Sequence, residues 1–255
     1  MNPIYPIMSV IVVSLISLIA AVPLLLKKKL SERILLFLLS MSVGVLLSTV
    51  FLNFLPEIFE HEYHLSVGLV ILLGFFLMFI LEKLVHWHHS KKCEHGECGH
   101  GHAYNLAPIN LIGDGIHNFI DGLVIAGAYS VNIVVGLVST VSIIFHEVPQ
   151  EIADFGVLLY SGMSKKKAIV FNFLSALTSL IGVIVGLLLV NKLHGFTEFV
   201  IPFAAGNFIY IAASNLTPQL HRHCGMKDSL IHLVAILLGI LIVVLMTVYG
   251  PVHLH

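Results

Sequence analysis

The strongest constraint on this chain is a series of apolar runs, each about as long as a membrane crossing. A helix needs about 20 predominantly apolar residues to cross the hydrocarbon core of a bilayer. The sequence offers eight such runs, at residues 7–26, 34–55, 65–85, 105–129, 133–160, 168–190, 199–219 and 230–249. Charged residues make up only 11% of the chain, whereas soluble domains carry roughly 25%. We therefore predict an all-α integral membrane protein with one transmembrane domain over residues 1–255.

The basic residues predict the orientation of this domain. If the eight runs cross the membrane in turn, all but Lys192 of the 13 Lys and Arg residues fall on one side. By the positive-inside rule that side is cytoplasmic, so both termini are expected outside the cytoplasm of a cell (plasma) membrane. The first run has no basic residues before it and no clear cleavage site, so we expect a retained span and not a signal peptide.

Two of the apolar runs carry acids and histidines without any basic neighbour. No Lys or Arg occurs between Lys92 and Lys165, and an unpaired Asp at the bilayer centre costs roughly 2.5 to 3.5 kcal/mol. The ionisable residues in these runs are Asp114, His117, Asp121, His146, Glu147, Glu151 and Asp154. The cost of burying these acids can be offset in three remaining ways: by protonation, by hydration or by a bound metal ion.

The spacing of these residues favours a metal ion. Residues three and four apart share one face of a helix. On the first helix this face carries Asp114, His117, Asn118 and Asp121, and on the second it pairs His146 with Gln150 and Glu147 with Glu151. Imidazole, carboxylate and amide groups without Cys or Met suit zinc, ferrous iron or manganese, and two histidines fit zinc well.

A Gly-to-Pro spacing that occurs in two of the runs, which we call the Gly-to-Pro echo, predicts how the other runs are arranged. Gly44 precedes Pro56 by the same twelve residues that separate Gly206 from Pro218. These pairs lie in the second and seventh runs, which would cross the membrane in opposite directions. We expect a 3+2+3 arrangement with inverted outer repeats and a central metal site on the fourth and fifth helices, because transporters commonly bind their substrate where such repeats meet.

The segment 86–104 is predicted to be a cytoplasmic loop rich in potential metal ligands. Its candidate ligands are His88, His89, Cys93, His95, Cys98, His100 and His102. A tract of this composition is typical of metal binding, but it lacks the paired CxxC spacing of a structural zinc site. We expect labile binding or sensing, and no disulfides, since all three cysteines lie on the cytosolic side.

The two polar motifs resemble those of the ZIP (Zrt/Irt-like) metal-ion transporter family, in the branch whose fifth helix carries an H-E-x-P-H-E signature. The residues His-Asn-Phe-Ile-Asp-Gly at 117–122 resemble the fourth-helix motif of that branch, and His-Glu-Val-Pro-Gln-Glu at 146–151 resembles its fifth-helix motif. The resemblance implies alternating-access transport of a divalent ion toward the cytosol, with elevator-like movement of the helices that carry it.

The resemblance also implies a set of ligands. The main site would use His117, Asp121, His146 and Gln150, and a neighbouring site Asn118, Asp121, Glu147 and Gln150, with Glu151 as a further ligand. Further candidates on the metal path are Asn53, Asp114, Asp154, Asn172 and Ser179. For Asp114 and Asp154, a solvated or packing role near a helix end is the alternative. This chain departs from that branch at Gln150, where most members have His and others Glu, and at Asn53, where the branch tends to have His.

Two other functions use the same residues. The segment 146–150 approaches the H-E-x-x-H pattern of a zinc protease, with Gln150 in place of the second His, and a metal sensor would bind without transporting. We expect a transporter and not an enzyme, no cofactor beyond the transported ion, and zinc as that ion, with iron, manganese or cadmium as alternatives. The expected partners are the divalent ion and the lipid bilayer, without nucleic acid, and a homodimer is left open.

Overall fold

The protein is helical over the residues that its computed structural model describes, which are 2–25, 32–60, 64–93, 106–160, 162–193, 195–221 and 225–249. Its helices are α1 (Ile4–Leu25), α2 (Glu32–Thr49), α3 (Leu55–Glu60), α4 (Leu65–Cys93), α5 (Leu106–Val131), α6 (Ile133–Tyr160), α7 (Lys165–Ala176), α8 (Thr178–Lys192), α9 (Phe196–Ile209), α10 (Thr217–Leu220) and α11 (Met226–Tyr249), with π-helical turns η1 (Val50–Phe54) and η3 (Tyr210–Leu216). No strand occurs in these residues, which confirms the predicted all-α class.

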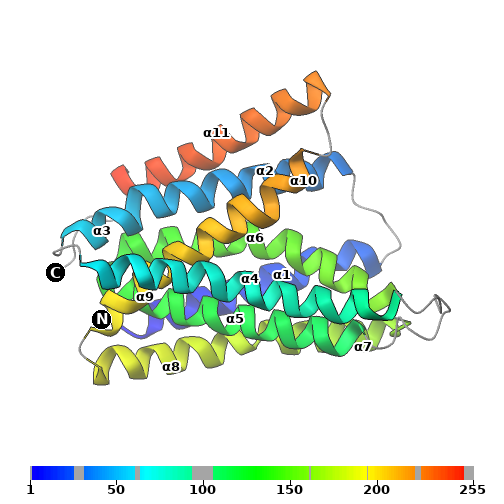
Figure 1. Ribbon diagram of the computed structural model, residues 1–255, viewed down its shortest axis with the longest axis horizontal. Coiled ribbons are helices and arrows are strands. Elements are labelled where there is room, and N and C mark those ends of the chain that lie inside the picture. Colours follow the sequence, from blue (N-terminus) through cyan, green and yellow to red (C-terminus); the bar gives the residue numbers. More distant parts are fainter. Residues whose placement is uncertain are drawn as a thin grey trace.

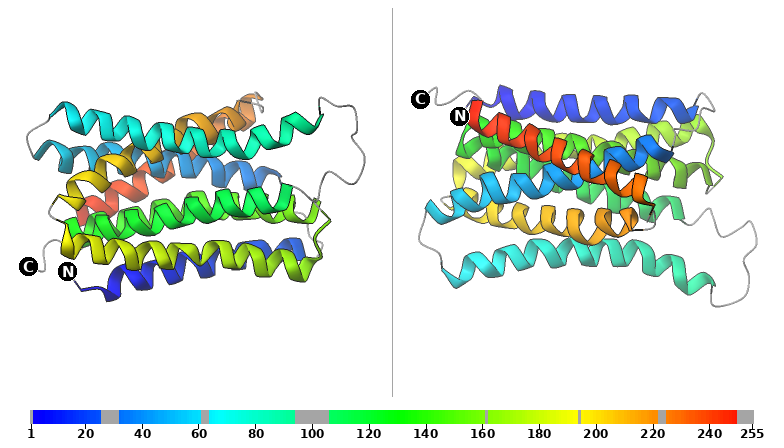
Figure 2. Two further views of the ribbon diagram at one scale, coloured as in Figure 1. Left: turned by 60° about the horizontal axis from the view of Figure 1, so that its bottom comes forward. Right: turned by 90° about the horizontal axis from the view of Figure 1, so that it is seen from above.

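The long helices lie side by side in one bundle (Figure 1, Figure 2). The π-helical turns join α2 to α3 and α9 to α10, so the predicted runs 34–55 and 199–219 each lie within one helical rod. Six rods are long and apolar enough to cross a membrane, as expected of an integral membrane protein. The helix α5 is not among them because it carries the polar stripe, and its crossing, like that of α1 and the exact eight-span arrangement, stays a prediction.

The outer helices expose apolar side chains as lipid-facing helices do. Only 11% of the apolar window of α4 and 22% of that of α11 is buried inside the protein. Leu65, Leu69 and Phe76 on α4 are among the exposed large hydrophobic side chains. A soluble protein rarely exposes an apolar surface of this extent, so these faces fit a bilayer.

Glycines hold α5 against α8 at close range. A Cβ atom built at Gly122 of α5 would collide with the carbonyl oxygen of Ser179, and one built at Gly182 of α8 would collide with that of Phe119. The same reciprocal contact joins α2 to α11 through Gly44 and Gly239, and α4 to α9 through Gly74 and Gly206. Small residues let membrane helices pack this closely.

The Gly-to-Pro echo has a structural counterpart. The π-helical turns η1 and η3 each end two residues before a proline, Pro56 and Pro218 respectively, and the glycine that begins each echo packs on a neighbouring helix. Equivalent contacts of this kind are what inverted repeats would produce. The inverted arrangement itself stays a prediction.

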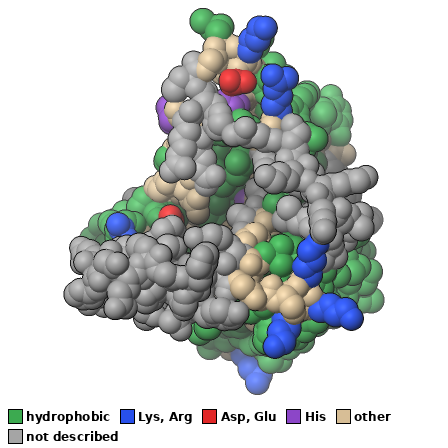
Figure 3. Space-filling model, turned by 90° about the vertical axis from the view of Figure 1, so that its right-hand side faces the viewer, with side chains coloured by type: hydrophobic (Ala, Val, Ile, Leu, Met, Phe, Trp, Pro, Cys, Tyr) green, Lys and Arg blue, Asp and Glu red, His purple; other side chains and the backbone are tan. Residues whose placement is uncertain are grey.

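The two ends of the bundle differ in charge. The helix α1 begins and α11 ends at one end, on the left in Figure 1. At the opposite end, Arg33, Lys165 and Lys227 lie in the first turns of α2, α7 and α11, and the charged side chains drawn there are mainly Lys and Arg (Figure 3). We call this the basic end. Lys192 closes α8 at the other end, so the described charges follow the predicted asymmetry.

The predicted loop 86–104 begins later than expected. The helix α4 continues to Cys93, because the first glycine after Gly74 is Gly96 and no proline interrupts the helix before then. His88, His89 and Cys93 are therefore helical positions and not loop positions. The other proposed loop ligands, His95, Cys98, His100 and His102, lie outside the described residues.

Candidate metal centre

The candidate metal centre lies between α5 and α6, near the middle of both helices. The two helices are joined by Asn132 alone, whose side-chain oxygen accepts the backbone N–H of Val135 at 2.9 Å and so caps the first turn of α6. This tight connection makes α5 and α6 antiparallel neighbours. Their polar stripes therefore face each other across one interface.

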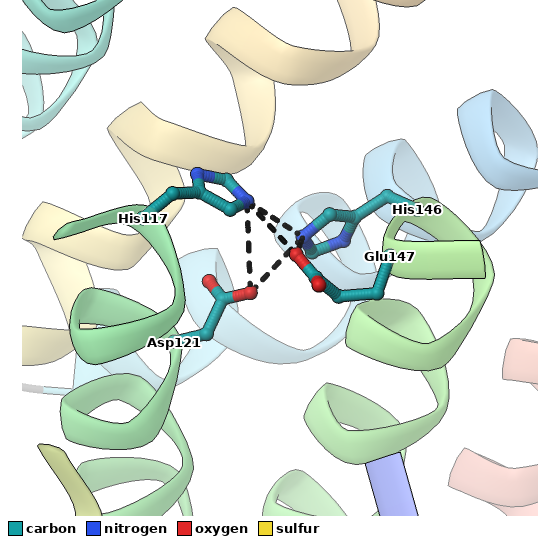
Figure 4. A group of neighbouring side chains, drawn as sticks. All are labelled: His117, Asp121, His146 and Glu147. Atoms are coloured by element: carbon teal, nitrogen blue, oxygen red, sulfur yellow. Dashed lines mark hydrogen bonds and ion pairs between the residues drawn. The ribbon is translucent and has the colours of Figure 1, made fainter. Parts of the chain in front are cut away.

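Four buried side chains meet there, and we call them the tetrad: His117, Asp121, His146 and Glu147 (Figure 4). His117 and Asp121 are one turn apart on α5, and His146 and Glu147 are consecutive on α6. One ligand atom from each residue lies within 4.8 Å of the corresponding atom of every other. The sequence predicted all four as ligands, and the structure brings them together.

The distances within the tetrad match those between the ligands of one small cation. The two Nε2 atoms of His117 and His146 are 3.3 Å apart. Asp121 Oδ2 lies 3.1 Å from His146 Nε2 and 3.7 Å from His117 Nε2, and Glu147 Oε1 lies 3.2 Å from His117 Nε2 and 3.7 Å from His146 Nε2. Ligand atoms about 2.0 to 2.1 Å from a tetrahedral zinc ion stand about 3.3 Å from each other.

The tautomer of His146 leaves a lone pair for the ion. Its Nδ1 donates a hydrogen bond of 3.0 Å to the carbonyl oxygen of Ser142, one turn earlier on α6. A neutral imidazole carries one N–H, so Nε2 is the acceptor. Backbone carbonyls orient metal-binding histidines in this way. The ring of Phe208 from α9 stands edge-on to His146, with the ring centroids 5.9 Å apart, and closes that side with an apolar group.

Asn118 and Gln150 both turn toward Asp114. The side-chain nitrogen of Asn118 donates to Asp114 Oδ1 at 3.0 Å and to the Asp114 carbonyl oxygen at 3.2 Å. The side-chain nitrogen of Gln150 lies 3.5 Å from the same Oδ1. These amide nitrogens are hydrogen-bond donors, which cannot bind a cation. The ligand roles that the resemblance gives to both residues stay predictions.

Further polar side chains follow the tetrad toward the basic end, namely those of Glu151, Asn172 and Asp154. We call this series the polar line. Asn172 of α7 donates its side-chain N–H to Glu151 Oε2, so the sixth predicted span does reach the site. Asn110 of α5 donates to Asp154 Oδ1 at 3.1 Å. Asn110 escaped the sequence analysis, although it lies four residues before Asp114 on the same helical face.

Asn53 and Ser179 lie in helix contacts with other residues. Asn53 Oδ1 accepts a hydrogen bond of 3.2 Å from Thr247 of α11. The hydroxyl of Ser179 donates to the Ala176 carbonyl oxygen at 2.5 Å and lies 3.4 Å from that of Ser14 on α1. The place on the metal path that was predicted for both residues stays a prediction. Phe208, which does contact the tetrad, carries no signal in the sequence that would identify it.

Comparisons with known proteins identify the family of this chain. The family model described as ZIP Zinc transporter matches residues 3–109 and 95–247. The chain is similar to the human "Zinc transporter ZIP10", with 33% identity over 67% of this chain and 22% of that protein. It is also similar to the Caenorhabditis briggsae "Zinc transporter zipt-7.1", with 38% identity over 52% of this chain and 37% of that protein.

A third relative covers nearly the whole chain. The human "Metal cation symporter ZIP14" is 26% identical over 96% of this chain and 67% of its own length. The chain spans only about a fifth of the length of the ZIP10 relatives. The family model, by contrast, matches most of the chain, including both polar motifs. The chain therefore belongs to the ZIP zinc transporter family.

Proposed function

We propose that this protein moves divalent metal ions across the membrane toward the cytosol, and that the tetrad holds the ion during transport. The observation that carries the proposal is the convergence of two imidazoles and two carboxylates in a buried site, at distances suited to one ion. Zinc is the proposed ion because two imidazole nitrogens suit it better than they suit harder ions. Iron, manganese and cadmium are the alternatives.

The charge at the two ends supports the proposed orientation of the protein, and the direction toward the cytosol is the one that the family resemblance implies. Lys and Arg gather at the basic end, and the positive-inside rule makes this end cytosolic. The polar line from the tetrad through Glu151 to Asp154 runs toward the same end. An ion released from the tetrad along this line would enter the cytosol. We also propose that the protein lies in the cell (plasma) membrane and forms a homodimer.

The comparisons favour transport over the two other functions considered. All the relatives described above are named as transporters or as a symporter. The protease alternative needs a second metal ligand at position 150, where the amide nitrogen of Gln150 is directed at Asp114. Alternating access in this family would let the same tetrad face each side in turn.

Uptake by proteoliposomes that contain the purified protein tests the proposal. A zinc-sensitive dye inside the vesicles should report uptake, and His117→Ala or Asp121→Asn should reduce the rate at least about tenfold, since each removes a ligand worth more than about 1.4 kcal/mol. The matched control is His232→Ala, which replaces a buried histidine of α11 that lies outside the tetrad. Wild-type vesicles without uptake, or uptake unaffected by both tetrad substitutions, would overturn the proposal.

A further inference from the structure

Pro149 leaves one carbonyl group of α6 without its usual helical donor. In an α-helix each carbonyl oxygen accepts the backbone N–H group of the residue four positions later, and proline has no such group. Pro149 lies inside α6, so the carbonyl oxygen of Phe145 loses that partner. Phe145 directly precedes His146. The affected carbonyl group therefore belongs to the turn of α6 that carries His146 and Glu147 into the tetrad.

A serine of another helix supplies the missing donor. The hydroxyl of Ser42, a fully buried residue of α2, donates to the Phe145 carbonyl oxygen at 2.5 Å. The same hydroxyl lies 2.8 Å from the carbonyl oxygen of Leu38, but that oxygen already has the backbone N–H of Ser42 as its donor within α2. A serine hydroxyl has one proton to donate. The Phe145 oxygen is the nearer acceptor and the one that has lost its helical donor.

A second hydroxyl of α2 contacts the same part of α6. Thr49 lies two turns after Ser42 on α2, and its hydroxyl oxygen is 2.5 Å from that of Ser142. Ser142 is the residue whose carbonyl oxygen accepts the Nδ1–H group of His146. Both Thr49 and Ser142 are fully buried. Hydrogen bonds therefore join α2 to both ends of the turn that leads into His146.

Other buried serines in these two helices bond only within their own helix in the contacts that the structure describes. The hydroxyl of Ser40 donates to the Leu36 carbonyl oxygen at 2.7 Å, and that of Ser139 donates to the Val135 carbonyl oxygen at 2.7 Å. This contact with the carbonyl four residues earlier is the common one for serine in a helix. Ser42 differs because its nearer acceptor belongs to a second helix, so a local helical role does not account for it.

We propose that Ser42 is a positioning residue of the metal centre. Its hydroxyl replaces the backbone donor that Pro149 removes, and it thereby holds the turn of α6 that presents His146 and Glu147. This role rests on the proposed function, because the geometry of the tetrad matters only if the tetrad holds the ion. Groups that orient metal ligands without touching the metal typically change metal affinity about 10- to 100-fold when they are removed.

Calorimetric titration of the purified full-length protein with zinc tests this role. The tetrad is identified as the zinc site that His117→Ala removes. Ser42→Ala should weaken that site at least about tenfold. The matched control Ser40→Ala removes a buried hydroxyl that bonds within α2, and it should bind zinc as the wild type does. An unchanged affinity in Ser42→Ala, or an equal loss in Ser40→Ala, overturns the inference.

Pro149→Ala gives a rescue that a merely structural serine would not show. Alanine restores an N–H group four residues after Phe145, so the carbonyl oxygen no longer needs the Ser42 hydroxyl. In the Pro149→Ala background, Ser42→Ala should therefore change zinc affinity far less than it does in the wild type. If Ser42→Ala alone does not fold, the double variant should fold. Equal losses in the two backgrounds overturn the inference, as does a double variant that does not fold when Pro149→Ala does.

The proposed transport function fails separately. A wild type that binds zinc at the tetrad but takes up none into proteoliposomes overturns transport. The comparison of Ser42→Ala in the two backgrounds measures binding alone, so it still decides the role of Ser42.

Discussion

At the scale of single residues, the direction of lone pairs decides what the site can bind. The carbonyl oxygen of Ser142 fixes the proton of His146 on Nδ1 and leaves Nε2 free for an ion. Gln150 presents its side-chain N–H group to Asp114, so in this arrangement it is a hydrogen-bond donor and not a ligand.

Replacement of Gln150 by His should therefore favour zinc. An imidazole at position 150, beside Asp114, would offer a nitrogen ligand in place of an amide, and we expect the ratio of zinc affinity to Mn²⁺ affinity to rise about tenfold, or about 1.4 kcal/mol. Competition calorimetry on the purified protein measures this ratio. The control Asn191→His places a histidine near the exposed end of α8. A ratio that stays at the wild-type value would show that position 150 does not face the ion.

The sequence predicted the members of the site better than their pairings. Helical spacing placed His117 and Asp121 on one face of α5, one turn apart, but it paired His146 with Gln150, whereas the structure brings His146 and its neighbour Glu147 to them. It did not show that Asn118 would turn to Asp114 or that Asn172 would bond Glu151. Those contacts depend on side-chain rotamers and on how α7 packs, and neither leaves a periodic signal.

At the scale of helices, glycine contacts set the spacing that the site needs. Gly122 lies one residue after Asp121, and its contact with the Ser179 carbonyl oxygen holds α5 close to α8. The apolar runs predicted where helices lie. They could not predict that α4 extends to Cys93, because hydropathy reports the part of a helix in contact with lipid and not its polar continuation beyond the membrane.

Gly122→Ala should destabilise the protein, whereas Gly156→Ala should not. A Cβ at Gly122 collides with backbone, and overpacking of this kind costs about 1 to 3 kcal/mol. Gly156 on α6 has nothing within 4 Å of an added Cβ, so alanine there should stabilise the helix by roughly 0.5 to 1 kcal/mol. Thermal melting in detergent compares the two variants. Equal melting temperatures would contradict the role given to the glycine contact.

At the scale of the whole molecule, the charge asymmetry and the polar line point the same way. The N-terminal end of α1 and the C-terminal end of α11 lie at the same end of the bundle, opposite the basic end. The tetrad, Glu151 and Asp154 follow one another from the middle of the bundle toward the Lys residues. Under the proposed function, this order is the path that an ion would take to the cytosol.

Cysteine labelling in intact cells tests the orientation. In a background whose native cysteines are replaced by Ser, Lys192→Cys should react with an impermeant maleimide added outside, because Lys192 is exposed at the end of α8. Lys227→Cys, exposed at the start of α11, should react only after permeabilisation. The reverse pattern would invert the membrane orientation and with it the proposed direction.

The most direct test of the central claim is X-ray absorption at the zinc edge, because it reports the ligands of a bound ion. The sample is the protein with one equivalent of zinc, with His88, His89, His95, His100 and His102 replaced by Ala and the cysteines by Ser. We predict nitrogen and oxygen ligands about 2.0 to 2.2 Å from zinc, two of them imidazoles, and loss of the imidazole signal in His117→Ala/His146→Ala. The same imidazole signal in that double variant would contradict the account.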